Sequence, residues 1–121
     1  MDGLIEELED MGCNMEETME RFMYNEELFF ECLDKALDDK SFAQLGKNLE
    51  DKEVRPAFEN AHNLKGLMAN MGLAPIYDEV VQIVEPLRNG ILNDELIVHY
   101  ERMMEEREKF LNVYKKYQES L

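Results

Sequence analysis

Apolar residues recur every three or four positions along nearly the whole chain, and this spacing most strongly limits how it can fold. In residues 25–37 and again in residues 94–119, they line one side of a helix with 3.6 residues per turn. No segment shows the strict apolar–polar alternation of a β-strand. Helix-forming residues such as Glu, Leu, Met and Lys dominate the composition. The pattern therefore predicts an all-α protein.

Glycine, proline, asparagine and aspartate separate the periodic segments and set the expected helix ends. Asn25 and Asn93 stand where N-caps are expected, and Gly72 suits the left-handed position after a helix. Pro86 lies late in its segment, where it should loosen the last turn. The helices are expected at about residues 2–10, 15–23, 25–37, 41–51, 56–71, 75–89 and 94–119.

Short links between amphipathic helices favour antiparallel neighbours. We therefore expect an antiparallel four-helix bundle with an additional short N-terminal helix. Neither a linker nor a repeat nor a low-complexity tail interrupts the 121 residues, so one domain should span 1–121, with its core bundle at about 15–118. In the segment after Asn14, the residues expected on the buried stripe are Met15, Met19, Phe22 and Met23.

The formal net charge of −15 argues against nucleic acid and anionic membranes as partners, because both attract basic surfaces. It permits electrostatic steering toward a basic partner. The acidic opening MDGLIEELEDMG lacks the apolar run of a signal peptide, so a cytoplasmic location is expected. The two cysteines, Cys13 and Cys32, lack metal-site spacing and are expected to be reduced thiols.

The stretch AHNLKGLMANMG, residues 61–72, carries the candidate functional residues. On a helix, His62, Lys65 and Gly66 lie beside the core face rather than on it. A glycine inside a helix lowers the stability of that helix by about 1 kcal/mol relative to alanine. Gly66 is therefore expected to have a role that offsets this loss. The residues expected on the core face are Ala57, Ala61, Leu64, Met68 and Met71.

This combination suits phosphoryl chemistry. A neutral, exposed imidazole is a competent nucleophile near neutral pH. Lys65 lies one turn after His62, where its ammonium would offset the charge of a phosphoryl group. Gly66 leaves room beside the imidazole for another protein to approach. The three residues together predict a nucleophile with a neighbouring cation and an open approach.

The run from Ala61 to Gly66, followed by Asn70-Met71-Gly72, resembles the signature of histidine-containing phosphotransfer (HPt) domains. The likeness extends to the helix opened by NEELF at residues 25–29 and to VEPLRNG at residues 84–90. It implies that His62 accepts a phosphoryl group from the aspartyl phosphate of a receiver domain and passes it to another receiver aspartate. Lys65 would be the electrostatic partner, and Gly66 would clear the approach.

Such domains are carriers without kinase activity of their own. The resemblance therefore implies response-regulator receiver domains, or a hybrid sensor kinase, as partners. It also implies no bound cofactor, because the receiver supplies Mg²⁺. Arg88 matches a basic residue that some members place near the site. The position where some members carry an imidazole-orienting glutamine is Val84 here, with Gln82 two residues away, so support from this helix stays open.

Two other interpretations come from the same residues. Glu59-Asn60-Ala61-His62 is an E-x-x-H unit of the kind that di-iron bundles use twice, but Glu95 and His99 are four positions apart rather than three. A metal-binding bundle would also need His62 on the core face. A helical adaptor without phosphorylation explains the acidic helices but leaves Lys65 and Gly66 without a role.

Overall fold

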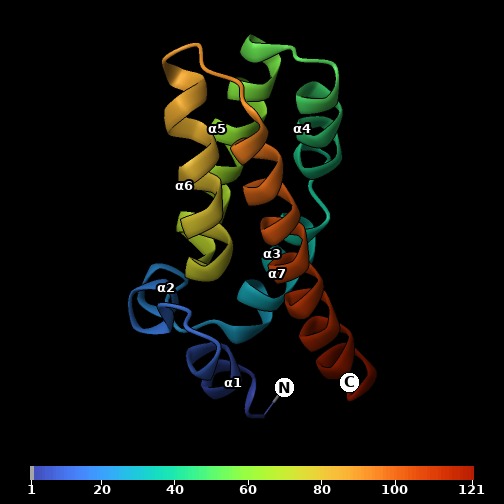
Figure 1. Ribbon diagram of the computed structural model, residues 1–121. Coiled ribbons are helices and arrows are strands. Elements are labelled where there is room, and N and C mark those ends of the chain that lie inside the picture. Colours follow the sequence, from blue (N-terminus) through green and yellow to red (C-terminus); the bar gives the residue numbers. More distant parts are fainter. Residues whose placement is uncertain (1) are drawn as a thin grey trace.

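The computed structural model describes residues 2–121, which form seven helices and no β-strand. An all-α fold is therefore confirmed for this part of the chain (Figure 1). The helices are α1 (Leu4–Asp10), α2 (Met15–Arg21), α3 (Glu26–Leu37), α4 (Ser41–Glu50), α5 (Val54–Met71), α6 (Ala74–Arg88) and α7 (Asp94–Glu119).

Helix α5 occupies the centre of the arrangement. It packs against α4 and α6, and α6 packs in turn against α7 (Figure 1). Helix α3 contacts both α5 and α7, whereas α1 and α2 lie together at the end that holds both termini. Three helices precede α4, close to the three residue ranges predicted for them from the sequence.

Asparagine side chains cap the starts of two helices, and a left-handed glycine ends α5, as expected. The Asn25 side chain accepts a hydrogen bond from the Leu28 backbone N–H at 3.0 Å, and Asn93 accepts one from Glu95 at 3.1 Å. Gly72 ends α5 with φ +71°. Its carbonyl accepts a hydrogen bond from the Asn14 N–H at 3.0 Å, which joins the start of α2 to the end of α5.

The predicted apolar stripe of α2 is wrong at its end. Met15 and Met19 are buried, but Met23 is 84% exposed. Helix α2 stops at Arg21, and Met23 and Tyr24 then adopt left-handed φ values of 56° and 58°. Helical spacing no longer applies beyond that point, so Met23 turns away from the core instead of continuing the stripe.

The predicted core face of α5 is confirmed, since all five of its residues are buried. They lie in one cluster with apolar side chains from every other helix. On the α4 side, the Asn63 amide donates a hydrogen bond to the buried Ser41 hydroxyl at 2.8 Å. With this face buried and Asn63 paired to α4, the neighbouring His62 is left exposed. No helix in the described part of the chain is both long and apolar enough to cross a membrane.

The two thiols should differ sharply in reactivity. Both cysteines are free, as expected, but Cys13 is only 7% exposed, and burial raises the pKa of its thiol to about 12. Cys32 is half-buried and lines a surface groove. A maleimide reagent should therefore modify Cys32 in the native protein and reach Cys13 only on unfolding. Mass spectrometry of wild type and Cys32→Ser checks this, and rapid native labelling of Cys32→Ser would contradict it.

Candidate functional site

His62 is exposed near the middle of α5 and packs against one aromatic ring. The Phe58 ring, one turn earlier, stacks on the imidazole with centroids 5.7 Å apart and planes 19° from parallel. The Arg88 guanidinium at the end of α6 lies over the Phe58 ring, 5.4 Å from its centroid. Two helices therefore build one surface that includes the imidazole, an aromatic ring and a cation.

Lys65 does not stand alone, because a carboxylate on α6 faces it. The Lys65 Nζ lies 3.8 Å from Oε1 of Glu85, and the Arg88 Nε lies 3.6 Å from Oε2 of the same carboxylate. Sequence reasoning missed Glu85, because it is twenty positions from Lys65 and only the pairing of α5 with α6 brings the two together. Its spacing of three from Arg88 was the one available signal.

Gly66 faces empty space. A Cβ atom added there would meet no atom of the described residues within 4 Å, apart from its own helix backbone and neighbours. Gly46, the other glycine inside a helix, behaves oppositely: its added Cβ would lie 2.5 Å from the Tyr100 hydroxyl. Gly46 thus permits close packing of α4 on α7, while Gly66 serves no packing need in the described structure.

Alanine at the two helical glycines should change stability in opposite directions. Gly66→Ala should raise the free energy of unfolding by about 0.5–1 kcal/mol, because helix propensity improves without a clash. Gly46→Ala should lower it by about 1–3 kcal/mol. There the Tyr100 ring would have to move, which would break its hydrogen bond to the Phe42 carbonyl at 2.8 Å.

Urea unfolding of both variants beside wild type measures these changes. Tyr100→Phe in the Gly46→Ala background separates the overpacking from the lost hydrogen bond. A Gly66→Ala variant less stable than wild type would contradict the open-space interpretation.

The sequence left open whether α6 supports the imidazole, and three positions on this helix bear on the question. Val84 is fully buried in the core, so it does not reach the imidazole surface. Gln82 is exposed, and no hydrogen bond joins it to His62 within residues 2–121. Phe58 makes the stacking contact instead, and Arg88 reaches this ring. The side chain that stacks on the imidazole thus comes from α5 itself, four positions before His62.

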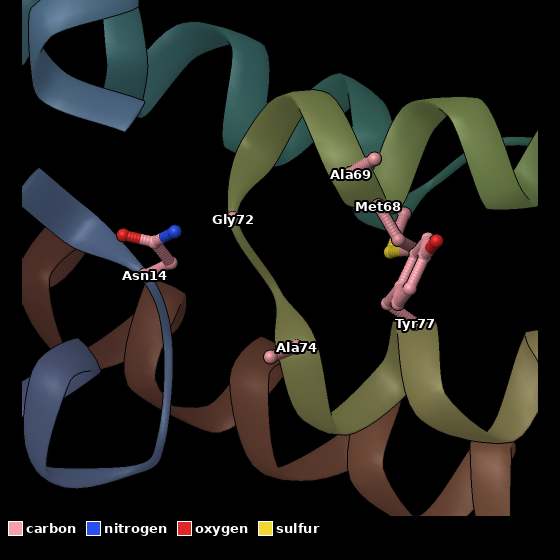
Figure 2. A pocket seen from close by; sticks show the side chains of 6 residues that line it. All are labelled: Asn14, Met68, Ala69, Gly72, Ala74 and Tyr77. Atoms are coloured by element: carbon pink, nitrogen blue, oxygen red, sulfur yellow. The ribbon is translucent and has the colours of Figure 1, made fainter. Parts of the chain in front are cut away.

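Two apolar hollows lie further along α5. One, of about 310 Å³, is lined by Leu67, Asn70 and Met71 of α5 with Cys32, Lys35 and Ala36 of α3, and extends to Phe22 and Asp39. A smaller one, of about 160 Å³, lies where α5 turns into α6 (Figure 2). Figure 2 shows Met68 beside Tyr77, with Asn14 on the other side of the turn at Gly72. Neither is lined by a histidine, so the imidazole belongs to an open surface.

The E-x-x-H unit does not face the core. The Glu59 carboxylate lies 3.3 Å from the Arg55 Nε on the exposed side of α5. The second histidine, His99, lies elsewhere, with its Nδ1 2.9 Å from the Glu79 carboxylate. Within residues 2–121, no three His, Cys, Asp or Glu side chains are grouped so that they could hold a metal ion.

Comparisons with protein-family models, curated proteins and solved structures give no match to this chain.

Proposed function

We propose that this chain is an HPt-type phosphorelay carrier in which His62 is transiently phosphorylated. In this proposal α4–α7 form the antiparallel four-helix bundle of such a domain, and the protein works in the cytoplasm. Its partners are response-regulator receiver domains or a hybrid sensor kinase. The carrier needs no cofactor of its own, because the receiver holds the Mg²⁺.

One observation carries the proposal: an exposed imidazole with empty space one turn further along the same helix. A receiver's aspartyl phosphate lies inside its own active site, so the nucleophile must be presented on a convex, unobstructed surface. His62 is exposed on α5, and no residue among 2–121 fills the space beside Gly66. A mid-helix glycine that destabilises its helix without aiding internal packing is explained by an external partner.

The chemistry needs little more than the imidazole. A ring nitrogen of His62 forms a bond to phosphorus while the P–O bond of the aspartyl phosphate breaks, and the aspartate carboxylate leaves. Onward transfer reverses these events on a second receiver. Lys65 and Arg88 reach this surface from two helices, and their positive charges favour a phosphoryl group there.

The groove between α3 and α5 offers apolar contact for a docking partner. It begins at Leu67, five positions after His62, and Phe22, Cys32 and Ala36 contribute to its wall. A partner that covers Gly66 would reach this groove, where apolar burial supports binding. The net charge of −15 also favours encounter with a basic docking face.

Incubation with a phosphorylated receiver domain and Mg²⁺ tests the proposal. Radiolabel should move from the receiver to this chain as an acid-labile, alkali-stable phosphohistidine, and a second unlabelled receiver should remove it. Binding of receivers without any transfer of label would instead favour the non-phosphorylated adaptor. Stoichiometric iron or manganese in the purified protein would favour the metal-binding bundle.

A further inference from the structure

The Glu85 carboxylate lies between two cations, Lys65 and Arg88. One of its oxygens faces Lys65 on α5 and the other faces Arg88, three positions further along α6. Lys65 shares the helix face beside His62, and Arg88 lies on the ring that stacks against the imidazole. In the free protein, both cations are therefore engaged with a carboxylate.

Neutralised cations attract a phosphoryl group less strongly than free ones. The exposed fraction of the side chain is 29% for Lys65, 52% for Glu85 and 46% for Arg88. Ion pairs this exposed are weak, so each side chain can leave its present partner for another at little cost in free energy. A negative carboxylate between these two cations also repels an approaching anion. Glu85 thus opposes the very charge that a phosphodonor brings to His62.

We infer that Glu85 is a specificity-determining residue that holds Lys65 and Arg88 and so protects His62 from small anionic phosphodonors. This inference rests on the proposed function, because it treats His62 as the phosphorylated residue. A docked protein partner can offset the carboxylate with contacts of its own. A free small donor has no such contacts and meets the full repulsion.

Phosphoramidate, a small anionic donor, tests the inference without any receiver. A His62 ring nitrogen attacks phosphorus, the donor's P–N bond breaks, and ammonia leaves with the proton released by the imidazole. Glu85→Gln should accelerate this labelling about threefold at low salt, since one negative charge is removed and two cations are freed. The gain should disappear near 1 M salt, where screening acts over about 3 Å.

Asp78→Asn is the matched control. It removes one negative charge from an exposed position two turns earlier on α6. It should leave the rate nearly unchanged if the effect is local. In a Lys65→Ala background, Glu85→Gln should lose the part of its gain that comes from freeing Lys65, because the two side chains interact directly. This non-additivity separates the charge effect from a structural role of Glu85.

The outcomes distinguish the inference from the proposed function. Labelling of His62 at equal rates in wild type, Glu85→Gln and Asp78→Asn would overturn the inference alone. A rate gain in Glu85→Gln together with no exchange between the chain and any receiver would uphold the inference and overturn the relay. Phosphoramidate that fails to label His62 would overturn the inference, because the residue would lack the assumed reactivity.

Discussion

Replacing His62 by glutamine should abolish phosphorylation of this chain by a phosphorylated receiver. The carboxamide of glutamine has no nucleophilic lone pair comparable to that of imidazole, so no phosphoryl bond forms. The fold should survive, because His62 is exposed and a surface substitution usually changes stability by about 0.5 kcal/mol or less. We expect the acid-labile label to fall below detection while circular dichroism and the melting temperature stay near wild type.

His99→Gln provides a matched control for this experiment, because His99 is the only other histidine of the chain. It pairs with Glu79 and lies 23% exposed between α6 and α7. Its replacement leaves that carboxylate without its partner and should lower stability, yet labelling on His62 should persist. Label that remains in His62→Gln and vanishes in His99→Gln would reassign the phosphorylated residue.

The second large effect is expected at Gly66. Gly66→Gln should slow transfer from a receiver by about ten- to hundredfold, because misplacement of the reacting groups by about 1 Å can have an effect of this size. The helix itself should be at least as stable as wild type, since glutamine favours helix more than glycine does and nothing obstructs its Cβ. Rapid-quench transfer kinetics and urea unfolding measure the two effects separately.

Ala43→Gln adds the same side chain to an exposed position of α4 and should leave the transfer rate unchanged. Phosphoramidate labelling of Gly66→Gln adds a second comparison. A small donor needs less room than a protein, so the substitution should slow labelling by phosphoramidate far less than it slows transfer from a receiver. If a receiver transfers its phosphoryl group to Gly66→Gln at the wild-type rate, the empty space beside His62 is not where the receiver docks.

Local patterns predict much of this fold because helix formation depends on neighbouring residues. Asn25 and Asn93 cap their helices, and Gly72 takes the left-handed conformation at the end of α5, as predicted. The apolar face of α5 is buried at all five expected positions. The error at Met23 arose because periodicity does not show where a helix stops when no glycine or proline marks its end.

The site was predictable only where its residues share one helix. His62, Lys65 and Gly66 lie within five positions, so helical spacing alone placed them on one surface. The sequence pointed to Arg88 and Gln82 on α6 without deciding between them. In the structure, Arg88 reaches the site over Phe58, while Gln82 makes no hydrogen bond to the imidazole within residues 2–121.

The sequence by itself determined the helices, the exposed imidazole and the glycine after it, because each depends on residues within about one turn. Only the tertiary structure decided that Gly66 opens into empty space while Gly46 accommodates Tyr100. It alone also brought Glu85 against Lys65. Both facts depend on how α4, α6 and α7 rotate and pack against their neighbours. These rotations are set by the simultaneous burial of many side chains that are distant in sequence, so the spacing of residues within one helix cannot predict them.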